Sequence, residues 1–172
     1  WNQTMLSVFI NKSEVMLSWL KNISFNFTHF IRINDSVEGI APNYKDLLKL
    51  SKKLDFHIKP ISLGDSNIRK LSKGNLSMLI DLSNISPSYQ PGHSHSDALN
   101  FLLFYRNTPI IVDPAISTYE KNKSRDRERS SCYHNIVVRN NENHDEIWSS
   151  FRVGRSSKTK ILKENKNNFK AI

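Results

Sequence analysis

Two short apolar runs with a turn between them constrain the fold of this chain more than any other feature. Residues 101–105 and 109–112 are apolar, and the residues between them are polar. Runs of this length around a short polar turn are typical of a β-hairpin. His93 and His95 precede the first run, and Asp113 follows the second. Because hairpin strands are antiparallel, the sequence predicts that these three side chains lie close together.

A third histidine extends this group. His134 follows Asp113 in the chain and also leads into an apolar run, so we expect it to arrive on a third strand. If residues 93–95 are extended, His93 and His95 face the same side. Imidazole nitrogens and one carboxylate are ligands that zinc accepts. The alternative interpretation is that these are ordinary polar residues at strand ends.

Four blocks with distinctive residues follow one another in the second half of the chain. They are residues 93–97 (HSHSD), 110–114 (IIVDP), 129–138 (RSSCYHNIVV) and 148–155 (WSSFRVGR). In this order and at these spacings the blocks resemble the metal-bearing part of the heparinase II/III-like family of polysaccharide lyases. Residues 33–42 resemble the end of the helical toroid of the same family. The resemblance therefore covers about residues 33–155.

The apolar pattern changes near residue 60. Before it, residues 6–20 and 47–54 carry apolar side chains at helical spacing. After it, short runs predict strands. These strands are expected at residues 76–82, 98–105, 109–113, 134–139, 147–153 and 158–162. The polar tail 163–170 is predicted to be a turn or a frayed end.

Together with the resemblance, this pattern predicts an α+β fold. Residues 1–59 would be the closing helices of an (α/α) toroid. Residues 60–172 would be the N-terminal part of an antiparallel β-sandwich domain. The chain begins at Trp1 without a signal peptide, so we expect a fragment of a larger protein. The resemblance implies a periplasmic or secreted protein.

Composition sets looser bounds on partners. Lys and Arg number 25 against 16 Asp and Glu, a net charge of +9, which favours an acidic partner. The single Cys132 excludes an internal disulfide framework. No apolar stretch approaches the roughly 20 residues that span a bilayer, so no membrane span is predicted. The oligomeric state is left open.

Basic residues occur at every second position of one segment. They are Lys121, Lys123, Arg125, Arg127 and Arg129. If this segment is extended, all five cations share one face, which suits an acidic polymer. The alternative is a solvated loop between two strands. Nucleic acid is not predicted as a partner, because few aromatic residues are interleaved and no recognition motif is present.

The resemblance implies a ligand set for a structural metal, Zn²⁺ or another divalent ion. These ligands are His95, Asp113 and His134. Asp97 is a weaker candidate, expected to orient a histidine or to cap the motif. Ala115 stands where the family usually has Gly after Asp-Pro, which leaves the turn beyond Asp113 open.

The same resemblance implies a substrate cleft. His93 would line it and take part in catalysis, by meeting a uronate carboxylate or moving a proton. The alternative is that His93 supports the metal site by a hydrogen bond. Arg129 and Tyr119 are the predicted substrate-binding residues.

The implied reaction is β-elimination in an acidic polysaccharide that contains uronic acid. A base removes the C5 proton beside the carboxylate, the 4-linked oxygen leaves, and an unsaturated sugar remains. In the family an Asn-His pair and a Tyr of the toroid supply most of the groups required, and these would lie upstream of Trp1. The second hypothesis is a metal-stabilised carbohydrate-binding or scaffolding module without turnover. The sequence upstream would distinguish the two.

Overall fold

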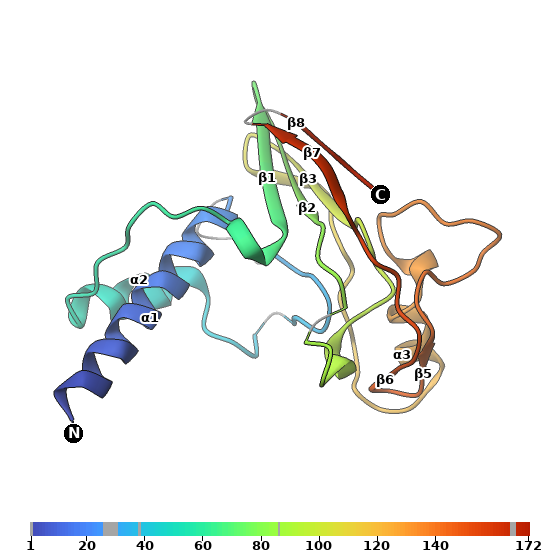
Figure 1. Cartoon of the computed structure of the whole chain (residues 1–172), viewed down its shortest axis with the longest axis horizontal. Coiled ribbons are helices and arrows are strands. Elements are labelled where there is room, and N and C mark those ends of the chain that lie inside the picture. The colour runs from blue at the N-terminus through green and yellow to red at the C-terminus, as the bar shows by residue number, and fades with distance from the viewer. Residues whose placement is uncertain (1, 26–30, 38, 86, 166–167) are drawn as a thin grey trace.

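Two helices open the chain. The structure, a computed structural model, describes residues 2–25, 31–37, 39–85, 87–165 and 168–172. Helices α1 (Gln3–Ile23) and α2 (Tyr44–Lys53) lie together on one side of the molecule, and the strands lie on the other (Figure 1). Asn2 and Asn43 cap their first turns by accepting backbone N–H bonds. The predicted helical character of this part is confirmed.

Four antiparallel strands form the main sheet. They are β1 (Ile68–Lys73), β2 (Leu76–Asp81), β3 (Phe101–Tyr105) and β4 (Thr108–Ile111), in that spatial order, and η1 (Gly64–Ser66) precedes them. The predicted β3–β4 hairpin is confirmed. Arg106 and Asn107 form its turn with φ of 48° and 65°, the left-handed pair that a two-residue hairpin turn requires. Strand β1 was not predicted, because its many polar residues obscure the alternation of apolar and polar side chains that is typical of a strand.

Two further hairpins complete the strands of the described residues. They are β5 (Ile147–Trp148) with β6 (Arg152–Val153), and β7 (Ile161–Asn165) with β8 (Asn168–Ala171). The prediction of a turn or frayed end at residues 163–170 was therefore wrong, although residues 166 and 167 lie outside the described part. Phe169 and Ala171 are half-buried and alternate with exposed neighbours, a strand pattern that the Asn and Lys residues hid.

The segments around the predicted site are not strands. Pro91–His93 is the short 3-10 turn η2, and Ser131–Tyr133 is the similar turn η3. The strand predicted at residues 134–139 is therefore wrong, and His134 arrives from a turn. Helix α3 (Lys123–Glu128) replaces the extended basic run, because Asn122 caps its first turn.

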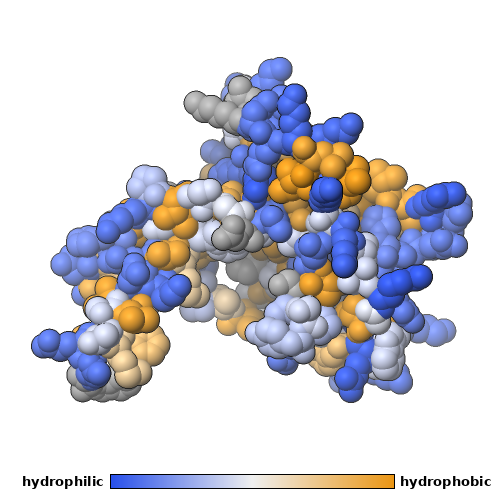
Figure 2. Space-filling model, viewed as in Figure 1, coloured by the Kyte–Doolittle hydropathy of each residue, from blue (hydrophilic) through white to orange (hydrophobic). Residues whose placement is uncertain are grey.

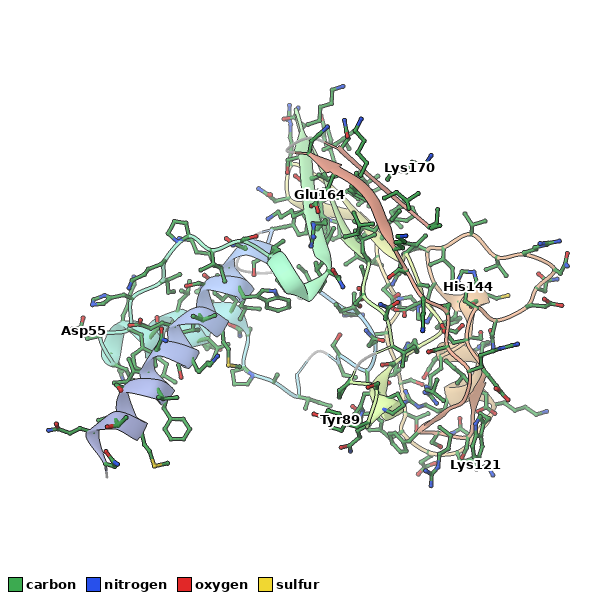
Figure 3. The ribbon with its side chains drawn as sticks, viewed as in Figure 1. Asp55, Tyr89, Lys121, His144, Glu164 and Lys170 are labelled. Carbon is green, nitrogen blue, oxygen red and sulfur yellow. The ribbon has the colours of Figure 1, made fainter. Side chains whose placement is uncertain are left out.

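The helix separates the five cations. Arg125 and Arg129 are fully buried, whereas Lys121, Lys123 and Arg127 are exposed. Figure 3 shows Lys121 at the outer end of the molecule beyond α3. The five cations therefore do not share one face.

The apolar core joins the end of α1 to the main sheet. Its buried members are Ile23, Phe25, Ile68, Leu79, Leu102 and Phe104. The rings of Phe25 and Phe104 stack with centroids 3.7 Å apart, and Lys70 Nζ lies 4.2 Å from the Phe25 centroid. The helical and β parts thus share one core. The predicted α+β class is confirmed, while the toroid, the β-sandwich and the division at residue 59 stay predictions.

Helices α1 and α2 leave apolar surface uncovered. Met5, Val8, Phe9 and Met16 of α1 are at least half exposed. An apolar groove of about 650 Å³ lies between the two helices, and Figure 2 shows orange patches over this part among blue polar ones. In the described part of the chain, no helix combines the length and apolarity of a membrane span.

The shared core makes a stability prediction at Phe104. We expect Phe104→Ala to lower the free energy of unfolding by about 3–5 kcal/mol, because a buried stacked ring leaves a cavity. Tyr105→Ala is the control, since Tyr105 is the next residue on β3 and is exposed; its expected loss is below about 1 kcal/mol. Denaturant unfolding measures both, and equal losses would contradict this core.

Candidate functional site

The two histidines of the His-Ser-His motif lie in different environments. The His95 side chain is fully buried, whereas 65% of the His93 side chain is exposed. Turn η2 produces the difference, because it ends at His93. A Cβ on Gly92 would lie 3.1 Å from the carbonyl oxygen of Phe151, a tight contact, so the close approach of this turn to the β5–β6 hairpin favours glycine. The expectation of an extended segment is therefore wrong, although the two rings do converge, on the carboxylate of Asp35.

One carboxylate holds both rings. Asp35 Oδ2 lies 2.8 Å from His93 Nδ1, and Asp35 Oδ1 lies 2.8 Å from His95 Nε2. Asn34 adds a third contact, since its Oδ1 accepts the backbone N–H of His95 at 3.0 Å. Figure 1 shows that the segment between α1 and α2 runs across to the β part and returns. Sequence reasoning placed this segment at the end of the toroid and missed its role at the site.

A buried arginine faces the same carboxylate. Arg125 donates from Nη1 to Asp35 Oδ1 and from Nη2 to Asp35 Oδ2 at 2.7 Å, and it also donates to the carbonyl oxygen of Ser150. Burial alone would raise the pKa of Asp35. The hydrogen bonds from His95, Arg125 and His93 outweigh burial and hold that pKa well below its usual range. Asp35 is therefore ionised.

A second buried arginine holds the loop between the histidines. Arg129 donates from Nε and Nη2 to the carbonyl oxygen of Ser94, and from Nη1 to that of Ser149. Burial, together with the charge of Arg125, lowers the pKa of Arg129 to about 10. The substrate contact predicted for Arg129 stays a prediction. The geometry assigns this guanidinium to two backbone carbonyls.

Asp113 and His134 form a buried pair behind this loop. Asp113 Oδ2 lies 2.7 Å from His134 Nδ1 and accepts a bond from Asn100 Nδ2 at 2.6 Å, while its Oδ1 accepts the N–H of Ala115 at 2.8 Å. Ala115 has φ of 61°, so the turn keeps the left-handed conformation without a glycine. Burial would lower the pKa of His134, but the bond to Asp113 outweighs it and raises that pKa. A metal ion that binds the His134 ring would have to displace the proton that this raised pKa favours.

The structure brings Asp97 into the predicted metal set. Asp97, Asp113 and His134 each offer a ligand atom within 4.8 Å of the others, and all three residues are buried. His95 is not in this group, although its ring centroid lies 5.1 Å from that of His134. The predicted roles of His95, Asp113 and His134 as ligands stay predictions. Asp97 follows His95 by two positions, which was the available sequence signal.

Three buried atoms of these residues have no hydrogen-bond partner among the described residues. They are His95 Nδ1, Asp97 Oδ2 and His134 Nε2. A buried polar atom without a partner costs about 1–3 kcal/mol, so three together indicate that a bound group completes them. Imidazole nitrogens and carboxylate oxygens are ligands of zinc and other divalent ions. These residues therefore fit a divalent metal.

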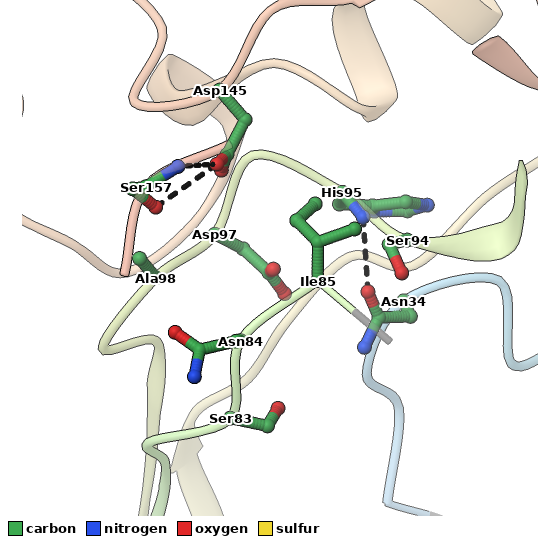
Figure 4. Close-up of a pocket in the computed structure, with 10 residues that line it drawn as sticks. All are labelled: Asn34, Ser83, Asn84, Ile85, Ser94, His95, Asp97, Ala98, Asp145 and Ser157. Atoms are coloured by element: carbon green, nitrogen blue, oxygen red, sulfur yellow. Dashed lines mark hydrogen bonds between the residues drawn. The ribbon is translucent and has the colours of Figure 1, made fainter. Parts of the chain in front are cut away.

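A small polar cavity borders this group. Its volume is about 60 Å³, and Figure 4 shows the Asp97 carboxylate pointing into it, with Asn84 and Asp145 among the other lining residues. Burial raises the pKa of Asp97 to about 7, and the charges of Asp81, Asp113 and Asp145 add to that effect. A bound cation would offset this accumulation of negative charge.

An aromatic face surrounds His93 on the outer side. The His93 ring meets Tyr119 and Phe151 edge-on, at centroid distances of 6.1 and 5.6 Å. Tyr119 and Phe151 stack on each other at 5.8 Å and are both more than 40% exposed. The guanidinium carbon of Arg125 lies 5.4 Å from both ring centroids. Sequence reasoning named Tyr119 but missed Phe151, which it assigned only to a strand.

The fold and the site define an α+β protein with a buried carboxylate–histidine centre beside an exposed histidine. A model described as heparinase II/III-like, C-terminal, matches residues 58–171, which is most of the chain. The chain therefore belongs to the heparinase II/III-like family, and the predicted family is confirmed. No curated protein and no solved structure matches it.

The buried centre makes a prediction about metal content. We expect the purified protein to carry about one equivalent of Zn²⁺ or another divalent ion, since its ligands close only in the folded chain. Alanine at His95, Asp97, Asp113 or His134 should each lower that content, measured by elemental analysis. His144→Ala is the control, because His144 Nε2 is bonded to the carbonyl oxygen of Val137. Full metal content in all four variants would show that these residues do not bind the metal.

Proposed function

We propose that this chain is part of a polysaccharide lyase that cleaves acidic, uronic-acid-containing polysaccharide by β-elimination and holds a structural divalent metal. The observation that carries the proposal is the division of the His-Ser-His pair. His95 is buried beside the small polar cavity, whereas His93 is exposed on an aromatic face. A pair that only bound metal would bury both rings, so the exposed ring supports a role toward a substrate.

His93 has one nitrogen that no described residue binds, and this nitrogen is available for that role. Its Nδ1 faces Asp35, which leaves Nε2 to donate to a uronate carboxylate or to accept a proton. Tyr119 and Phe151 flank the ring and offer flat apolar faces on which a sugar ring could lie. In the proposal His93 is catalytic and Tyr119 binds substrate. Arg129 contributes to substrate binding through Ser94, whose carbonyl oxygen it holds between the histidines.

The proposed metal is Zn²⁺ or another divalent ion, held by His95, Asp113 and His134, with Asp97 within reach. When bound, the ion supplies positive charge and ties together three loops that the sequence keeps apart. The loops carry the residues adjacent to His93, so the metal supports the cleft without acting on the substrate.

The remaining acid and base groups are proposed to lie on an (α/α) toroid outside this chain. The exposed apolar residues of α1 and the groove between α1 and α2 support this part of the proposal. Helices with uncovered apolar faces are expected to pack on further helices. We also propose that residues 60–172 belong to a β-sandwich and that the protein is periplasmic or secreted, as the family resemblance implies.

The division of the histidine pair predicts two different failures. In a polypeptide that joins this chain to its toroid, His93→Ala should keep metal and melting temperature. It should lose about 10² to 10⁴ in turnover, because one proton-transfer or hydrogen-bonding group is removed. His95→Ala should lose metal and stability together. Ultraviolet absorbance of the unsaturated uronate measures turnover, and a wild-type rate in His93→Ala would withdraw His93 from catalysis.

The aromatic face predicts polysaccharide binding by this chain itself. Phe151→Ala should weaken binding of a polyuronate at least about tenfold, because it removes one stacked ring from the face, and a tenfold change corresponds to about 1.4 kcal/mol. Tyr105→Ala, an exposed ring on the β3–β4 hairpin, should leave binding unchanged. Calorimetry with acidic and neutral polymers measures both. Binding without turnover in the toroid-bearing protein would favour a carbohydrate-binding or scaffolding module.

A further inference from the structure

Asp35 lies before the segment that matches the family domain, yet it binds three side chains inside that segment. The match begins at residue 58. The Asp35 side chain is 6% exposed, and its two oxygens meet His93, His95 and Arg125. The hydroxyl of Tyr119 also donates to the backbone oxygen of Asp35 at 3.3 Å. His93, His95, Arg125 and Tyr119 thus all bond to one acidic residue from outside the matched domain.

The chemistry of a carboxylate fixes the protons on both rings. Arg125 donates to both oxygens of Asp35, as a guanidinium does to a carboxylate, and a carboxylate only accepts hydrogen bonds, so each ring nitrogen that faces it must carry a proton. His93 therefore carries its proton on Nδ1, and His95 carries its proton on Nε2. The opposite nitrogens keep their lone pairs. In His93 this is Nε2, on an exposed ring, and in His95 it is Nδ1, which is buried and has no hydrogen-bond partner in the described part of the chain.

We propose that Asp35 is a positioning residue that sets opposite tautomers in the two histidines of the His-Ser-His pair. Each oxygen accepts a hydrogen bond from one ring. A single carboxylate thereby leaves the lone pair of His93 on the nitrogen of the exposed ring and the lone pair of His95 on the nitrogen available to the proposed metal. The significance of the two tautomers rests on the proposed function, whereas the tautomers themselves depend only on the contacts of Asp35.

Arg125 keeps the carboxylate in the orientation that this role requires. It donates to both oxygens of Asp35, and the carbonyl oxygen of Ser150 fixes the guanidinium from the other side. Two parallel bonds between a guanidinium and a carboxylate set the plane of the pair. Each oxygen therefore points at its own histidine, and an exchange of partners would break both bonds to Arg125.

An amide in place of the Asp35 carboxylate can accept a hydrogen bond from only one of the two rings. Asparagine offers one acceptor oxygen and one NH₂ donor. In Asp35→Asn, the ring that faces the NH₂ group must present a lone pair, so its proton moves to the other nitrogen. A wild-type ring pair with opposite tautomers should become a pair in which one ring is reversed.

Long-range ¹H–¹⁵N spectra of the imidazoles test this in the full chain, at about pH 8, above the ordinary imidazole pKa of about 6.5. In the wild-type chain we expect the proton of His93 on Nδ1 and that of His95 on Nε2. Asp35→Asn should reverse one of them. Glu128→Gln is the control, because its buried carboxylate binds Ser117 and should leave both tautomers unchanged. The wild-type spectrum tests the inference even if the variant does not fold.

The outcomes separate this inference from the proposed function. Equal tautomers in the wild-type rings, or wild-type tautomers retained in folded Asp35→Asn, would overturn the role of Asp35. In the expected case, Asp35→Asn should also bind Zn²⁺ roughly 10–100-fold more weakly, as loss of a carboxylate behind a metal-binding histidine does. If the tautomers are as expected but the toroid-bearing protein has no lyase activity, the positioning role stands and the proposed function fails.

Discussion

The carboxylate of Asp35 joins segments that are far apart in the sequence. Asp35 belongs to the segment that connects α1 to α2 in the sequence, and its partners come from the His-Ser-His loop and from α3. Burying a charge is expensive unless it is paired and hydrogen-bonded, and here both requirements are met by Arg125 and two imidazoles. The burial of Arg125 and of His95 depends in turn on this carboxylate. Removal of the Asp35 carboxylate would leave the buried side chains of Arg125 and His95 without this partner.

The same arrangement explains why Arg125 of α3 and Arg129, the residue that caps the end of this helix, both point inward. The two are four residues apart, so they lie on the same side of this segment. Arg125 neutralises Asp35, and Arg129 fixes the backbone at Ser94 between the two histidines. Because the guanidiniums meet carbonyls and a carboxylate in fixed directions, they hold loops that have few apolar contacts. This gives an ordered site on segments that are neither strands nor long helices.

The two buried histidines of the candidate metal site are held in a similar way. His95 presents one nitrogen to Asp35 and His134 presents one to Asp113, and the other nitrogen of each ring is buried without a hydrogen-bond partner among the described residues. A carboxylate behind an imidazole, as Asp35 lies behind His95, orients the ring and increases its basicity toward a metal. The Asp35 carboxylate also binds His93, so one carboxylate orients a histidine of the candidate metal site and the histidine of the exposed aromatic face.

The sequence by itself determined the α+β class, the β3–β4 hairpin, the family, and the approach of Asp113 to His134. These follow from local apolar period, turn chemistry and ordered blocks, which the chain expresses over a few neighbouring residues. The tertiary structure alone decided the roles of Asp35, Arg125 and Phe151, the helix in place of an extended basic run, and the separation of His93 from His95. These depend on contacts between residues such as Asp35 and Arg125 that lie far apart in the chain, and no local pattern encodes which distant charge a buried side chain will meet.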